Sequence, residues 1–97
     1  MTDRFTAELW EWAARDSWFF LTLPEDLADD IQARTDDTVR RGFGSLKVEA
    51  TIGATTWRTS IFPEKDGSYV LPVKKPVRVA ERIEPGDRVE VSLIVEP

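Results

Sequence analysis

The sequence predicts a mainly β domain, a small closed or split β-barrel of about six strands with two short helices, formed by residues 1–97 as a single unit. Three observations lead to this prediction. The chain of 97 residues, 41% of them hydrophobic, suffices for one core but not for two. Residues 44–62 read as a β-hairpin, and further short strands separated by turn signals occur before and after it.

Two strands are predicted near the N-terminus. Apolar and polar residues alternate over residues 5–12, which is typical of a strand. Residues 18–23 form a dense aromatic and aliphatic run that suits a strand buried on both sides. We expect the two strands to pair through a turn at residues 13–17.

A short helix over the barrel is predicted after the second strand. Pro24 occupies a favourable first helical position, Glu25 and Asp26 suit the helix dipole, and Leu27 and Ile31 are spaced i, i+4. Residues 34–42 show no periodicity and end in glycine, so they are predicted to form a surface loop.

The central hairpin has a register that can be stated residue by residue. Gly53 and Ala54 form a two-residue turn, with glycine where a positive φ is needed. The apolar face then pairs Ala50 with Trp57, Val48 with Thr59 and Leu46 with Ile61. The polar face pairs Lys47 with Ser60 and Glu49 with Arg58, the latter as an ion pair.

The C-terminal third contains two more strands and a second helix. A turn at residues 63–67 precedes a brief strand at 68–71 that Pro72 ends. Residues 74–84 are predicted to form a short helix, with Val77, Ala80 and Ile83 at three-residue spacing. A turn at 85–87 leads into a final strand at 88–95, where the odd-numbered residues 89, 91, 93 and 95 form one apolar face.

Composition argues against most catalytic chemistry. The chain has no cysteine and no histidine, which removes disulfides, thiolate and imidazole metal ligands, and the commonest general base. Ser60 and Thr59 near Lys47 lack a third group or an oxyanion hole. We therefore expect no enzyme activity, no catalytic residue and no cofactor.

Charge and hydropathy limit the expected partners. The net charge is −5, with a balance of −7 over residues 1–38 and +2 over residues 39–97. This distribution disfavours nonspecific binding to nucleic acid or anionic lipid. No apolar stretch approaches the roughly 20 residues that cross a bilayer, and residues 1–4 lack a signal-peptide pattern, so we expect a cytoplasmic location and no membrane.

The densest basic group is the first candidate binding site. It comprises Lys74, Lys75, Arg78 and Arg82, followed by Arg88, and a helix would place Lys74, Arg78 and Arg82 on one face. Such a face binds a phosphate or carboxylate of a small anionic ligand, or a nucleic-acid backbone. The alternative is a solvated face in which Arg78 pairs with Glu81, and the interleaved acidic residues favour it.

Trp10 and Trp12 are the second candidate binding site. They share one side of their strand, whereas Phe5, Ala7 and Leu9 share the other. Either the tryptophans are core residues beneath a helix, or they line a ligand groove or a surface for a protein partner. We expect core packing, because aromatic side chains supply much of the buried area of a small domain.

A metal site is not predicted. The acidic residues between 26 and 37 invite comparison with a calcium loop, but the glycine of the sharp turn and the closing glutamate are both missing.

Four motifs together resemble the bacterial domain-of-unknown-function family nineteen-oh-five. They are GFGSLKVEATIG at 42–53, WRTSIFP at 57–63, YVLPVKK at 69–75 and GDRVEV at 86–91. FTAEL at 5–9 and WFFLTLP at 18–24 extend the resemblance over nearly the whole chain. It implies a small closed β-barrel, whose relatives occur alone or fused to a domain associated with bacteriocin protection. It implies no established activity and no site residue.

Residues 71–91 show a looser likeness, to one element of the swapped-hairpin transcription factors of the AbrB and antitoxin type, which bind DNA as dimers. The function expected from the sequence is a noncatalytic module that binds a small ligand or a protein. A DNA-binding, antitoxin-like regulator is the alternative. An enzyme of unfamiliar type has no support in the sequence.

Overall fold

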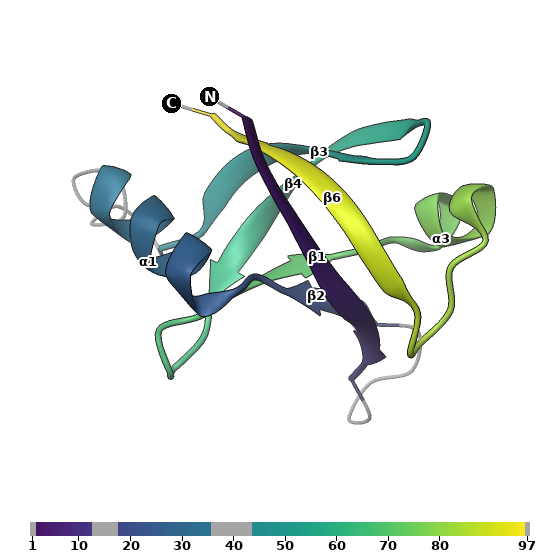
Figure 1. The fold of residues 1–97 in the computed structure, drawn as a ribbon, viewed down its shortest axis with the longest axis horizontal. Helices are drawn as coiled ribbons and strands as arrows, with labels where there is room; N and C mark the ends of the chain where they lie inside the picture. The colour runs from purple at the N-terminus through teal and green to yellow at the C-terminus, as the bar shows by residue number, and fades with distance from the viewer. Residues whose placement is uncertain (1, 13–17, 36–43, 97) are drawn as a thin grey trace.

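The computed structural model describes residues 2–12, 18–35 and 44–96, which form an antiparallel barrel (Figure 1). Its strands are β1 (Thr2–Glu11), β2 (Phe19–Thr22), β3 (Leu46–Ile52), β4 (Thr55–Pro63), β5 (Tyr69–Pro72) and β6 (Arg88–Val95). The helices are α1 (Glu25–Arg34) and α3 (Lys75–Glu81). The barrel closes in the order β1-β2-β5-β4-β3-β6, which confirms the predicted architecture.

The β3–β4 hairpin has the predicted register. Leu46 lies opposite Ile61, Val48 opposite Thr59 and Ala50 opposite Trp57, around a turn in which Gly53 has φ 57°. The polar pairs are also aligned, but the predicted ion pair between Glu49 and Arg58 is wrong. Arg58 instead forms an ion pair with Glu96. The backbone N–H of Glu96 donates a hydrogen bond to the Lys47 carbonyl, which holds Glu96 beside the hairpin.

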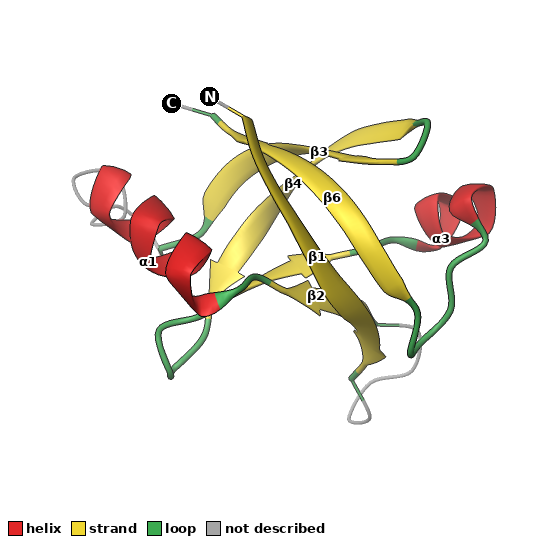
Figure 2. Ribbon diagram, in the orientation of Figure 1, coloured by secondary structure: helices red, strands yellow, loops and turns green. Residues whose placement is uncertain are grey.

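Helices α1 and α3 cover opposite ends of the barrel (Figure 2). Helix α1 buries Ala28 and Ile31 at one end, and α3 buries Val77 at the other. Pro24 caps α1 instead of being its first residue, a shift of one position. Helix α3 is shorter than the predicted 74–84 segment, because Arg82 turns left-handed at φ 55° and ends it.

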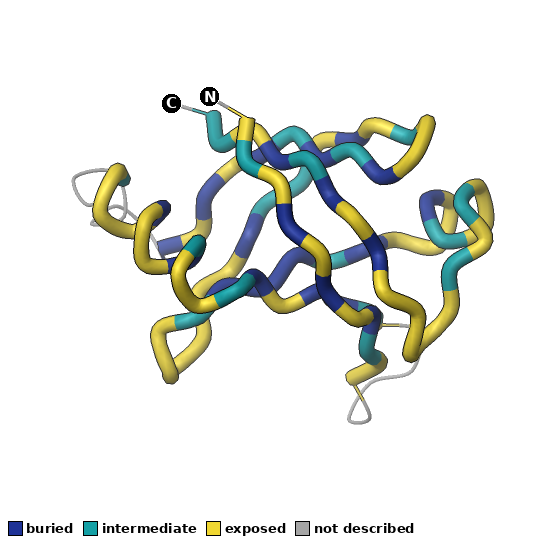
Figure 3. The backbone as a smooth tube through the Cα atoms, viewed as in Figure 1, coloured by how far each residue is buried: buried dark blue, intermediate teal, exposed yellow. Residues whose placement is uncertain are grey.

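Alternating side chains of the strands build the core, as the alternation of buried and exposed stretches in Figure 3 shows. Phe5, Ala7 and Leu9 of β1, which the alternation placed on one side of the strand, point inward. In β6, the predicted apolar face is buried at Val89, Val91 and Leu93 and half-buried at Val95. The turn predicted at 13–17 and most of the loop predicted at 34–42 lie outside the described residues.

Candidate functional site

A gap in the barrel wall opens between β4 and β5. Their ladder holds only two residue pairs, Phe62 with Val70 and Pro63 with Tyr69. Beyond them β5 stays with β2, and the N–H of Val73 donates to the Phe19 carbonyl at 2.9 Å. Pro72 has no N–H to offer β4, which favours separation of the strands here. A cavity of about 240 Å³, called the β4–β5 opening below, lies between the strands.

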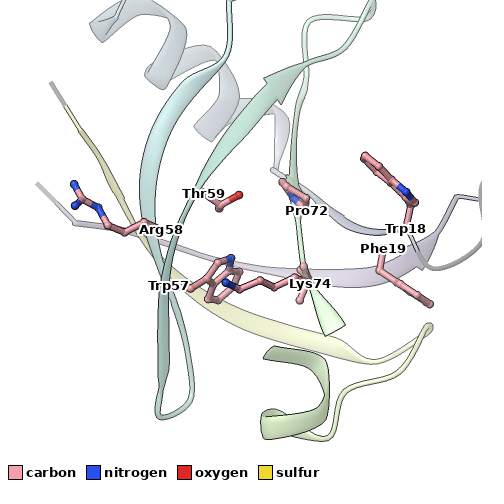
Figure 4. Close-up of a pocket in the computed structure, with 8 residues that line it drawn as sticks. Trp18, Phe19, Trp57, Arg58, Thr59, Pro72 and Lys74 are labelled. Atoms are coloured by element: carbon pink, nitrogen blue, oxygen red, sulfur yellow. The ribbon is translucent and has the colours of Figure 1, made fainter. Parts of the chain in front are cut away.

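Side chains from β4, β5 and the start of β2 line the β4–β5 opening (Figure 4). The lining residues are Trp18, Phe19, Trp57, Arg58, Thr59, Pro72, Val73 and Lys74. Most of this wall is apolar, and none of its described residues is a carboxylate. In Figure 4 the Thr59 hydroxyl and the Lys74 side chain are directed into the space between the strands, whereas Arg58 is directed away from it.

Trp57 brings a hydrogen-bond donor to the β4–β5 opening. The residue belongs to the core and is only 7% exposed. Its indole N–H donates a hydrogen bond to no described residue. Among the described residues, every side-chain nitrogen or oxygen that is fully buried has a hydrogen-bond partner, so this nitrogen is not fully buried. The N–H is therefore accessible to solvent, from a side chain that lines the opening.

The structure divides the basic group predicted from the sequence. Lys74 precedes the first residue of α3 and lines the β4–β5 opening, whereas Lys75, Arg78 and Arg82 line a separate, more open groove together with Glu84. Because α3 ends at Glu81, a single helix face carrying Lys74, Arg78 and Arg82 does not form.

Arg78 has a role that the sequence did not indicate. Its guanidinium carbon lies 3.7 Å from the centre of the Phe19 ring, and its Nε donates to the Val73 carbonyl at 3.1 Å. The predicted pairing with Glu81 is wrong, because Glu81 accepts a hydrogen bond from Thr55. Arg78 therefore fastens α3 to two residues that also line the β4–β5 opening.

The prediction that Trp10 and Trp12 are core residues is wrong. Leu9 and its partner Leu21 point inward, so the next pair, Trp10 and Phe20, points outward. Trp12 is 42% exposed, because α1 and α3, the helices of the described residues, lie at the barrel ends and leave this wall uncovered.

The outward-facing rings form an exterior aromatic cluster of Trp10, Trp12, Trp18 and Phe20. Ring centres lie 5.1 Å apart for Trp10 and Phe20 and 6.3 Å apart for Trp12 and Trp18, the latter edge to face. The Trp10 indole N–H donates to the Thr22 hydroxyl at 2.9 Å. The tryptophans shield Phe20, which is only 8% exposed although it points away from the core.

The residues of the β4–β5 opening other than Lys74 were not predicted as a site. The sequence predicted that Trp57 and Thr59 belong to the hairpin, but it did not predict that they lie beside β5, because local patterns do not determine which strands pair across a barrel. The one available signal was Pro72, which was predicted to end its strand.

Two carboxyl groups near these surfaces have shifted pKa values. The hydrogen bonds from Arg58 lower the pKa of Glu96, and those from the Ser68 hydroxyl and backbone N–H lower the pKa of Asp66. Burial raises the pKa of the Tyr69 phenol. None of these three residues lines the β4–β5 opening.

Within the described ranges, no three acidic side chains gather closely enough to hold a metal ion, and Asp36 and Asp37 fall outside those ranges. No helix in the described part of the chain has both the length and the apolar character needed to cross a membrane.

Comparison with known proteins identifies the family. No protein with curated annotation is significantly similar in sequence to this chain. Residues 5–93, which include all but the first three residues of β1 and all but the last two of β6, match the family described as Domain of unknown function (DUF1905). The match extends over far more than half of the chain, and the chain therefore belongs to the DUF1905 family.

Proposed function

We propose that this barrel is a noncatalytic module that binds a small molecule in the β4–β5 opening. The observation that carries the proposal is the indole N–H of Trp57, which is accessible to solvent and has no partner among the described residues. Binding sites for small molecules combine apolar walls with a few polar groups that orient the ligand. The opening has this composition, with Phe19, Pro72 and Val73 as walls.

The chemistry of the lining supports binding without catalysis. Hydrolytic and proton-transfer sites commonly use a carboxylate or histidine as base or a cysteine as nucleophile, and none of these side chains occurs among the described residues that line the opening. Glu96, which shares a neighbouring groove with Thr59, is bound to Arg58, and among the described residues no hydrogen bond joins the Thr59 hydroxyl to Lys74. We therefore assign the Thr59 hydroxyl a hydrogen-bonding role.

We do not extend the proposal to the two other surfaces. No described contact indicates what would cover the exterior aromatic cluster. The groove beside α3 is lined by Glu84 as well as by cations, and Arg78 already contacts Phe19 and Val73. These features disfavour binding of a nucleic-acid backbone or a polyphosphate in this groove.

The test is a nuclear magnetic resonance titration of the ¹⁵N-labelled protein with benzoate, benzamide and benzylamine. We expect at least one compound to shift the indole N–H signal of Trp57, assigned by its loss in Trp57→Phe, together with backbone amides beside the opening. A larger side chain in Thr59→Phe should abolish the shifts by filling the cavity. Thr56→Phe is the matched control, because Thr56 is exposed on the same strand and does not line the opening.

The proposal is overturned if none of the three compounds shifts these signals. It is also overturned if the shifts persist unchanged in Thr59→Phe, which would place the binding elsewhere on the barrel.

A further inference from the structure

We infer that the ligand of the β4–β5 opening is a small organic anion, namely a carboxylate attached to one flat apolar group. This inference rests on the proposed function, since it names the class of ligand for the same site. It follows from the charge, the hydrogen-bonding groups, the walls and the volume of the opening.

The charge of the opening is positive. Lys74 reaches into it and forms no ion pair with any described residue. Arg58, the other cation in the lining, is bound to Glu96 and points away. Because none of the described residues that line the opening is a carboxylate, the Lys74 ammonium has no counter-charge among them, and an anion is the ligand that supplies it.

The polar groups of the opening also require an acceptor. The Trp57 indole N–H and the Lys74 ammonium can only donate hydrogen bonds, and the Thr59 hydroxyl can donate as well. A carboxylate presents two oxygens with about four acceptor positions, so it can satisfy an indole and an ammonium together. A neutral amide presents a single acceptor oxygen, and its NH₂ group would face these donors.

The walls and the volume describe the rest of the ligand. Phe19, Pro72 and Val73 provide apolar surface, and Trp18 extends it at the mouth. The cavity has a volume of about 240 Å³, smaller than the roughly 300–1,000 Å³ of typical ligand pockets, which favours a ligand whose apolar group is about one ring. The opening has one ammonium without a counter-ion, that of Lys74, and this matches a ligand with one negative charge. Lys75 and Arg82 line the other groove and therefore add no charge to the opening.

The experiment compares three compounds of nearly identical shape that differ in charge: benzoate, benzamide and benzylamine. Affinities are measured from the shift of the Trp57 indole signal at low ionic strength. We expect benzoate to bind roughly tenfold more tightly than benzamide, as a charge-assisted hydrogen bond at an exposed ammonium implies. Benzylamine should bind most weakly, and added salt should reduce the benzoate preference.

Lys74→Met tests the residue that we hold responsible. It should weaken benzoate binding by roughly tenfold and leave benzamide unchanged, because only the charge-assisted contact is lost. Lys75→Met is the matched control. Lys75 is the adjacent lysine and is also exposed, but it lines the other groove, so its replacement should change neither affinity appreciably.

The outcomes separate the two proposals. If benzamide or benzylamine binds as tightly as benzoate, the ligand class is wrong and small-molecule binding stands. If Lys75→Met weakens benzoate as much as Lys74→Met does, the attraction is a general surface charge and the ligand class is again wrong. If no compound shifts the Trp57 signal, both proposals fail.

Discussion

The Thr55 hydroxyl donates a hydrogen bond to the Glu81 carboxylate, with 2.6 Å between Oγ1 and Oε2. This contact ties the last residue of α3 to the first residue of β4, just after the hairpin turn. The other carboxylate oxygen of Glu81 lies so close to Gly53 that a Cβ there would be 2.0 Å from it. The hairpin tip and α3 are thereby held together at the end of the barrel where Lys74 and Trp57 border the opening.

Gly53→Ala should destabilise the protein for two separable reasons. Alanine is strained at φ 57°, and its methyl group would displace Glu81. We expect a loss of about 1–3 kcal/mol in the free energy of unfolding, measured with urea. In a Glu81→Ala background the same change should cost at least about 0.5 kcal/mol less. Equal costs in the two backgrounds would show that the close approach of Glu81 is energetically irrelevant.

Arg78→Met should destabilise α3 although it keeps the apolar stem. The change removes the cation over the Phe19 ring and the hydrogen bond to Val73. We expect a loss of about 1–2 kcal/mol in the free energy of unfolding. Arg82→Met, an exposed position just after the helix, is the control and should stay within about 0.5 kcal/mol of the wild type. Similar losses in both variants would contradict the role assigned to Arg78.

The two kinds of tryptophan should differ in what they contribute to stability. Trp57 is 7% exposed within the core, so Trp57→Ala should cost about 3–5 kcal/mol in urea unfolding. Trp12 is 42% exposed and its ring contacts the exterior rings of Trp18 and Phe20, so Trp12→Ala should cost about 1 kcal/mol or less. A loss for Trp12→Ala as large as that for Trp57→Ala would indicate that the exterior aromatic cluster is a second core.

The ion pair of Arg58 and Glu96 should make stability depend on pH in the acidic range. Its hydrogen bonds lower the pKa of Glu96 in the folded protein below the ordinary value of 4.5. A group whose pKa is lower in the folded than in the unfolded state stabilises the protein at any pH above its unfolded-state pKa. This stabilisation is lost as the pH falls through the folded-state pKa. The contribution is therefore present at neutral pH and disappears below pH 4.5.

The measurement compares the free energy of unfolding of the wild type and Arg58→Gln from pH 7 to pH 3. The wild type should be slightly more stable at pH 7, and the difference should shrink as Glu96 becomes protonated. The difference should also shrink in concentrated salt, because the pair is on the surface. A difference that stays constant down to pH 3 would contradict the assignment to Glu96.

Patterns within one or two neighbouring strands were predictable from the sequence. The period-two alternation of β1 puts Phe5, Ala7 and Leu9 on one side of the strand and Trp10 and Trp12 on the other. The hairpin register follows from the turn at Gly53, because a slip of one residue would mix the apolar and polar faces. Both features depend on residues close together in the chain, where local geometry leaves few alternatives.

Only the tertiary structure decided which of these residues form a surface or a site. Trp10 is half-buried and Trp12 is exposed on the outside of the barrel because α1 and α3 cover the barrel ends, and no local pattern specifies where a helix packs. Lys74 and Lys75 are adjacent in sequence but line different cavities, since α3 begins between them. The β4–β5 opening itself arises because β5 leaves β4 and remains paired with β2. Pairing between strands distant in sequence is selected by the closure and packing of the whole barrel, which no single segment encodes.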